Sequence, residues 1–162
     1  MNATFRMLGS VLLLVSLTTP ALAKEVTVRR SDLPPAVAAT LDQRYPGAQV
    51  LGYSRETDRD GVRYEAEMRV RGQHVDALFG PRGKWLGDET EIRFADVPAP
   101  VKKAFEWYTA RGYHVEKTEK LADATRKGLR YEVLARAPGG LRELVFEASG
   151  KLVHSEARTQ VD

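Results

Sequence analysis

The clearest pattern along the chain is a strict alternation of apolar and polar residues in one long segment. Between residues 61 and 71 every second residue is apolar: Val62, Tyr64, Ala66, Met68 and Val70. A period of two over this length is typical of an antiparallel strand that buries one face. The segment 129–136 repeats the alternation, so we expect two half-buried strands of this kind.

Two other segments have the period of an amphipathic helix. We expect these helices to begin after Asp32 and Asp96, because an aspartate followed by proline in the first turn is a typical helix start. Each helix has one apolar stripe to bury, formed by Val37, Leu41 and Tyr45 in the first and by Val101, Ala104, Phe105 and Tyr108 in the second.

The predicted elements occur twice in the same order, as one helix followed by four strands. The distance between matching residues is 64 at the helix starts (33 to 97) and 67 at the long strands (61 to 128), as a short insertion in one loop would produce. The sequence therefore predicts two tandem repeats, residues 24–95 and 96–162, that share one cooperative domain. The predicted fold class is α+β, with the helices on one face of an antiparallel sheet and the other face open to water.

The first 23 residues have the pattern of a signal peptide. Arg6 precedes a short apolar core from Met7 to Leu17, and Ala21-Leu22-Ala23 is a small-residue cleavage pattern. We expect cleavage after Ala23 and a periplasmic or secreted protein. An uncleaved anchor is the alternative, although the apolar core is shorter than the ~20 residues that span a bilayer.

Charge and cysteine content narrow the possible functions. The chain has 25 basic and 22 acidic residues, interleaved along the strands, and it has no cysteine. Nucleic-acid binding is disfavoured because it uses a continuous basic surface. Disulfides, thiol catalysis and zinc sites with cysteine ligands are excluded.

Four recurring motifs resemble the PepSY-like periplasmic proteins. They are Leu-Pro-x-x-Val at a helix start, Tyr-Pro-Gly at its end, Gly-x-x-Tyr-Glu at the start of a long strand, and Gly-Lys-Trp-Leu at the end of the unit. The second half departs from two of them, with Arg111-Gly112 at the helix end and Leu152 in place of Trp85. The resemblance implies the fold of the β-lactamase inhibitory protein, with two helix-and-sheet subdomains. It also implies a non-enzymatic, exported protein that binds other proteins and in some relatives restrains peptidases.

The residues give little support to catalysis or to a bound cofactor. The chain has no nucleophile elbow, phosphate-binding glycine loop or zinc-protease motif. His74, His114 and His154 are scattered, and only His74 and Asp76 are close together on one predicted strand face. We therefore predict no enzyme activity, no cofactor and no metal site.

The predicted open face of the sheet is the candidate partner-binding surface. Charged side chains dominate this face in the first half, and the apolar Leu134, Leu141 and Val145 interrupt the charges in the second half. The full candidate set is Arg63, Glu65, Glu67, Arg69, His74, Asp76, Arg130, Glu132, Leu134, Arg136, Leu141, Glu143 and Val145. An apolar patch rimmed by charges is typical of a protein interface. Trp107 lies beside the stripe of the second helix, where it would either seal the junction between the repeats or contact a partner.

The sequence thus predicts a periplasmic binding or regulatory module for a protein or peptide partner, without nucleic-acid binding or membrane insertion after cleavage. The alternative is an envelope sensor that binds a small molecule or a metal ion.

Overall fold

The computed structural model describes residues 24–58 and 61–158, so the predicted signal peptide lies outside the described residues. The described chain forms one nine-stranded antiparallel sheet in which the strands lie in sequence order. The strands are β1 (Lys24–Thr27), β2 (Gln49–Asp58), β3 (Gly61–Val70), β4 (Gln73–Phe79), β5 (Trp85–Glu91), β6 (His114–Asp123), β7 (Arg130–Ala137), β8 (Gly140–Glu147) and β9 (Leu152–Arg158).

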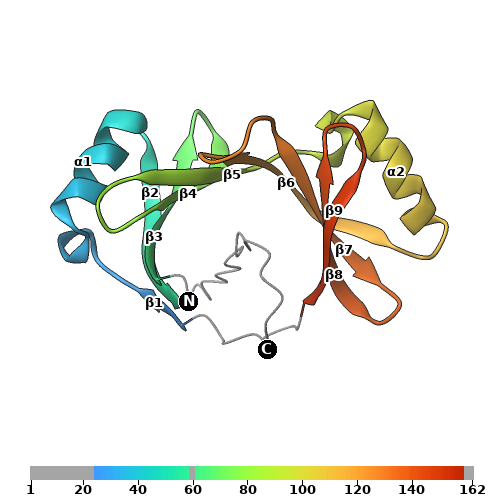
Figure 1. Ribbon diagram of the computed structural model, residues 1–162, viewed down its shortest axis with the longest axis horizontal. Helices are drawn as coiled ribbons and strands as arrows, with labels where there is room; N and C mark the ends of the chain where they lie inside the picture. The colour runs from blue at the N-terminus through green and yellow to red at the C-terminus, as the bar shows by residue number, and fades with distance from the viewer. Residues whose placement is uncertain (1–23, 59–60, 159–162) are drawn as a thin grey trace, which may run out of the picture.

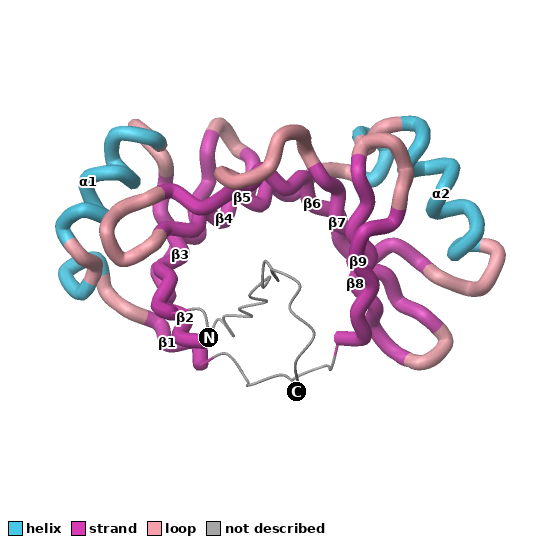
Figure 2. Tube along the Cα trace, viewed as in Figure 1, coloured by secondary structure: helices cyan, strands magenta, loops and turns pink. Residues whose placement is uncertain are grey.

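The sheet is strongly curved, and both helices lie on its convex side (Figures 1 and 2). Helix α1 (Pro35–Arg44) precedes β2, and helix α2 (Ala99–Thr109) precedes β6. The two helices lie near opposite ends of the arch, and β5 and β6 join the two halves at its centre (Figure 1). The inner face of the arch is therefore not covered by either helix.

Each helix buries its apolar stripe against its own set of strands. Val37 and Leu41 of α1 pack with Met68 of β3 and Phe79 of β4. Val101 and Phe105 of α2 pack in the same way with residues of β7 and β8: Tyr131, Val133, Ala135, Leu144 and Phe146. These are the alternate apolar positions of the strands, so the predicted alternation and the predicted helix stripes are both confirmed.

The predicted N-caps are wrong. Asp32 and Asp96 each end a short 3₁₀ turn, Arg30–Asp32 and Phe94–Asp96, and the residue at each α-helix N-cap is a proline. Both aspartates instead pair with an arginine three residues earlier, and the Arg93 Nε atom lies 2.8 Å from Asp96 Oδ2. The proline at each cap has an extended backbone that redirects the chain into the helix.

A polar cluster anchors the end of α1 to the sheet. Trp85 Nε1 donates a hydrogen bond to Asp88 Oδ1 at 2.7 Å, and the Tyr45 hydroxyl donates to the same oxygen. The Arg44 guanidinium lies 3.7 Å from the centre of the Trp85 ring. Burial, together with the bond to Asp88, raises the pKa of Tyr45. Trp85 also packs against the α1 core.

The sequence pattern did not reveal strand β1. It pairs with β2 from Lys24↔Thr57 to Thr27↔Ser54 and forms one edge of the sheet, so the described chain has one strand more than predicted. Four residues without apolar alternation carry too little signal to be recognised as a strand. Within the described residues, no helix has both the length and the apolar character needed to cross a membrane.

Candidate functional site

The candidate site is the inner surface of the arch, which we call the concave face. It consists of the strand side chains that alternate with the core residues and therefore point away from the helices. All the strand residues predicted for partner binding alternate with core residues in this way: Arg63, Glu65, Glu67, Arg69, His74, Asp76, Arg130, Glu132, Leu134, Arg136, Leu141, Glu143 and Val145. The structure thus brings the two predicted sets onto one continuous surface.

A row of buried carboxylates runs across the concave face, with one from each strand between β2 and β8. We call it the acid row: Glu56, Glu65, Asp76, Glu89, Glu119, Glu132 and Glu143. Some neighbours in the row are directly opposite in register, as Asp76 is to Glu89 and Glu119 is to Glu132. Each of the other neighbouring pairs is offset by two residues from the directly opposite position. The acid row therefore runs across the sheet, approximately perpendicular to the strands.

Crowding of these acids shifts their proton affinities. Burial, together with the charges of Asp76 and Glu56, raises the pKa of Glu65 to about 8. Burial likewise raises the pKa of Glu132 to about 8, with contributions from Glu143 and Glu119. Burial raises the pKa of Asp76 to about 6, against an opposing effect of His74. Carboxylates that share a poorly solvated surface resist losing their protons together.

Basic side chains partly neutralise the ends and the centre of the row. Lys117 Nζ lies 2.7 Å from Glu119 Oε1, Arg63 Nη2 lies 3.6 Å from Glu56 Oε2, and Arg158 Nε donates to Glu143 Oε2 at 2.6 Å. No hydrogen bond to Glu65 Oε2 or Asp76 Oδ1 exists among the described residues, although both atoms are buried. The row therefore has its least compensated charge on β3 and β4.

His74 is surrounded by three carboxylates beside the acid row. Its Nε2 atom lies 3.0 Å from Glu67 Oε1 and 3.7 Å from Asp76 Oδ1, and its Nδ1 atom lies 3.7 Å from Glu91 Oε2. An open hollow of about 570 Å³ adjoins this group, lined in part by Glu67, Arg69, His74 and Glu91. Pairing with Glu67 places His74 in the charged network of the concave face.

The apolar patch predicted in the second half is smaller than expected. Leu134 and Leu141 are half-buried, Val145 is buried, and Glu143 lies directly opposite Leu134 in the register of β7 and β8. The carboxylate of Glu143 therefore interrupts the patch. The dominant chemistry of the concave face is acidic in both halves.

Trp107 does not lie on this face. It is 55% exposed on α2, its ring contacts Tyr108, and the Arg111 guanidinium stacks 3.5 Å from the ring centre. These are contacts within one helix and its end, at the outer side of the arch. The placement argues against the predicted role in sealing a junction between the two halves.

The sequence interpretation missed three members of the acid row, Glu56, Glu89 and Glu119. Strand β5 extends from Trp85 to Glu91, and its part after Leu86 lacks the apolar alternation that marks a strand in the sequence. In β6 the register shifts between Val115 and Lys117, so alternation counted from the start of the strand assigns the wrong face to Glu119. Counting back from Asp123 would have placed Glu119 and Leu121 on one face.

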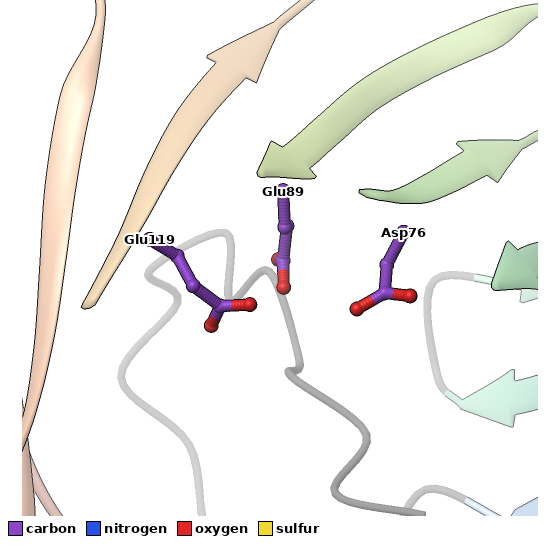
Figure 3. Close-up of side chains that lie close together, drawn as sticks. All are labelled: Asp76, Glu89 and Glu119. Atoms are coloured by element: carbon purple, nitrogen blue, oxygen red, sulfur yellow. The ribbon is translucent and has the colours of Figure 1, made fainter. Parts of the chain in front are cut away.

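The row can attract positive charge, and its centre can supply oxygen ligands. Asp76, Glu89 and Glu119 each offer a carboxylate oxygen, and these three oxygens lie within 4.8 Å of one another. Figure 3 shows the three side chains extending from adjacent strands toward a common space. Close carboxylates can share protons, bind a metal ion, or pair with lysine and arginine of another molecule.

Comparison with known proteins identifies the fold. No family model matches the chain, and no curated protein matches it. Among solved structures, a BLIP-like protein from Bacteroides fragilis superposes with a TM-score of 0.64 and 23% identity, over 80% of this chain and 89% of that chain. A DUF2874 family protein from Bacteroides uniformis has a TM-score of 0.65 and 20% identity, over 76% of this chain and 88% of that chain.

A third solved structure, from Bacteroides eggerthii, is described as a candidate periplasmic protein. It has a TM-score of 0.65 and 19% identity, over 76% of this chain and 88% of that chain. Likenesses at this level of identity show the fold alone. The chain therefore has the BLIP-like fold that its motifs predicted.

Proposed function

We propose that this protein is a non-enzymatic binding module of the periplasm that recognises a protein or peptide partner on its concave face. The observation that carries the proposal is the acid row on a sheet face that neither helix covers. Burying several carboxylates side by side costs folding free energy. Such a cost is typical of surfaces whose residues serve binding instead of stability.

The charge of the row indicates what kind of partner it fits. Burial raises the pKa values of Glu65, Asp76 and Glu132, and the charges of neighbouring carboxylates add to the rise. A segment rich in lysine or arginine would supply that charge and form charge-assisted hydrogen bonds with the carboxylates. We therefore propose a cationic protein segment as the occupant of the concave face.

Our proposal includes two tandem repeats, residues 24–95 and 96–162. Matching carboxylates on the concave face of the two halves support it. Glu65 on β3 corresponds to Glu132 on β7, and Asp76 on β4 corresponds to Glu143 on β8, each 67 residues later. Each half thus contributes matching carboxylates to the acid row. A long partner segment could contact both halves at once, which strengthens binding without new kinds of contact.

Export, PepSY-like membership and a peptidase-inhibitor-like role form the remaining parts of the proposal. The signal-like residues 1–23 and the candidate periplasmic protein with the same fold support a periplasmic location. The recurring motifs support the PepSY-like interpretation. The non-enzymatic part of the proposal is supported by the sequence, which has no nucleophile elbow, phosphate-binding glycine loop or zinc-protease motif.

Binding of a cationic peptide tests this function. We expect the protein, purified from the periplasmic fraction, to bind a labelled peptide of alternating lysine and alanine at pH 8. The affinity should fall steeply as salt is added, because the contacts are between charges. The double variant Glu65→Gln and Glu132→Gln should bind about tenfold more weakly, a loss of about 1.4 kcal/mol. Fluorescence anisotropy measures each affinity.

Two controls make the result specific. Glu106→Gln removes an exposed carboxylate from α2, far from the concave face, and should bind the peptide like the wild-type protein. A peptide with glutamate in place of lysine should not bind. The proposal fails if the two peptides bind equally, or if the double variant keeps wild-type affinity for the lysine peptide.

A further inference from the structure

The centre of the acid row has a geometry that the remainder of the row lacks. Asp76 on β4 and Glu89 on β5 lie directly opposite each other, and Glu119 on β6 lies two residues from the position opposite Glu89. Their three carboxylate oxygens lie within 4.8 Å of one another, and all three residues are buried (Figure 3). We call these residues the central triad. It lies where the two halves of the sheet meet.

A second observation concerns the hydrogen bonds of Asp76. Asp76 is only 7% exposed, and its Oδ1 atom receives no hydrogen bond from the described residues. The nearest basic atom recorded for it is His74 Nε2 at 3.7 Å, which is beyond hydrogen-bonding distance, and that atom already contacts Glu67 at 3.0 Å. A buried carboxylate oxygen in this state is costly unless another group satisfies it.

Glu65 adds to this uncompensated charge from the neighbouring strand. It is 7% exposed, its Oε2 atom receives no hydrogen bond within the described part of the chain, and its strongest charge interaction is with Asp76. Lys117 offsets part of the charge, but its ion pair is with Glu119. The β4 side of the triad thus combines buried oxygen atoms with missing positive charge.

We propose that the central triad binds a hard divalent cation, with Ca²⁺ as the favoured ion. Asp76, Glu89 and Glu119 would supply oxygen ligands, which are the donors that Ca²⁺ prefers. Carboxylates bind Ca²⁺ through one or both oxygens, so three of them with water can complete its shell. Zn²⁺ and Cu²⁺ are disfavoured because cysteine is absent and Glu67 engages His74. This site does not depend on the peptide-binding proposal, since the ion alone would bind.

Titration with metal ions tests the site. We expect isothermal titration calorimetry of the wild-type protein with CaCl₂ to show one ion per chain. A dissociation constant of about 10⁻⁴ to 10⁻³ M is expected, as in other extracellular calcium modules. Calcium should also raise the melting temperature, because only the folded protein assembles the site. MgCl₂ should bind more weakly, since Mg²⁺ demands a more regular shell.

Variants separate the triad from general charge on the same face. Asp76→Asn should weaken calcium binding at least tenfold and remove the calcium-dependent rise in melting temperature. Glu156→Gln removes an exposed carboxylate from β9 and should change the affinity less than twofold. Circular dichroism and the melting temperature without calcium show whether Asp76→Asn still folds, which we expect because it removes a buried charge. Glu89→Gln is the second variant if Asp76→Asn does not fold.

The results that overturn the proposal are distinct from those that overturn the peptide-binding function. No calcium heat and no change in melting temperature at about 10 mM Ca²⁺ would discard the site. So would equal affinities for wild type and Asp76→Asn, or many weak sites on both. Peptide binding is measured without divalent ions, so either function can fail while the other stands.

Discussion

Raising the pH from 5 to 8 is expected to lower the free energy of unfolding of this protein. Burial raises the pKa of Glu65 and of Glu132 to about 8 in the folded chain, from a value of 4.5 in the unfolded chain. Between these values the folded state holds protons that the unfolded state releases. The free energy of unfolding therefore falls as the pH rises through this window, on the order of 3 kcal/mol for each carboxyl.

The charges around each glutamate explain why the effect is large. Glu65 interacts with carboxylates from four strands: Glu25, Glu56, Glu67 and Asp76. The nearby Arg63 forms an ion pair with Glu56. Glu132 faces Glu143 and Glu119, with Arg158 and Lys117 acting in the opposite direction. The aspartates whose pKa is lowered, such as Asp123, lose their stabilising effect only at more acidic pH, below this window.

Urea unfolding at pH 5 and pH 8 measures this effect. Glu65→Gln and Glu132→Gln should each raise the free energy of unfolding at pH 8, by about 1 to 3 kcal/mol, and change it much less at pH 5. The matched control, Glu106→Gln on the exposed side of α2, should leave the pH dependence unchanged. A wild-type protein that is equally stable at both pH values would show that the acid row is not held in its protonated form.

The same two variants connect stability with function. If the concave face binds cations, Glu65→Gln and Glu132→Gln should stabilise the protein at pH 8 and weaken peptide binding at the same pH. That combination is the expected signature of residues kept for binding at the expense of folding free energy. Stabilisation without loss of peptide binding would instead locate the partner surface elsewhere.

The main elements were predictable because their signals are local. Alternation in β3 and β7 and the stripes of α1 and α2 come from residues that must face the core of their own half, and the structure places them there. Strand β1 was not predictable, since its position depends on pairing with β2 instead of on a pattern of its own. The predicted helix caps were wrong because an aspartate followed by proline occurs both at a capped helix start and in a 3₁₀ turn that precedes a helix, as at Asp32 and Pro34.

Most residues of the concave face were predictable one by one, but the site that they form was not. Alternation alone assigns Glu65 and Asp76 to the face opposite the core. Their burial and their closeness to Glu89 and Glu119 arise from the order and register of β4, β5 and β6, which join the two halves. Long-range strand pairing of this kind leaves no local sequence signal. The acid row is therefore a property of the assembled sheet.

Replacing Gly83 by alanine is expected to destabilise the fold by about 3 kcal/mol or more. Gly83 has φ +79°, and an added Cβ would lie 2.4 Å from the carbonyl oxygen of Ala36 in the first turn of α1. That atom belongs to the helix backbone, so it cannot move aside without shifting α1 on the sheet. The turn between β4 and β5 is itself closed by a hydrogen bond from Gly83 N to Gly80 O at 2.9 Å.

Gly72 is the matched control, because it has φ +85° and nothing lies within 4 Å of its added Cβ. Gly72→Ala should cost only the left-handed backbone conformation, about 1 to 2 kcal/mol. Gly150 has φ +85°, and its added Cβ would lie 2.4 Å from the carbonyl oxygen of Pro100 at the start of α2, so Gly150→Ala should match Gly83→Ala. Urea unfolding of the three variants compares these costs. Equal losses of stability in Gly83→Ala and Gly72→Ala would show that close contact with the helix does not explain the glycines at positions 83 and 150.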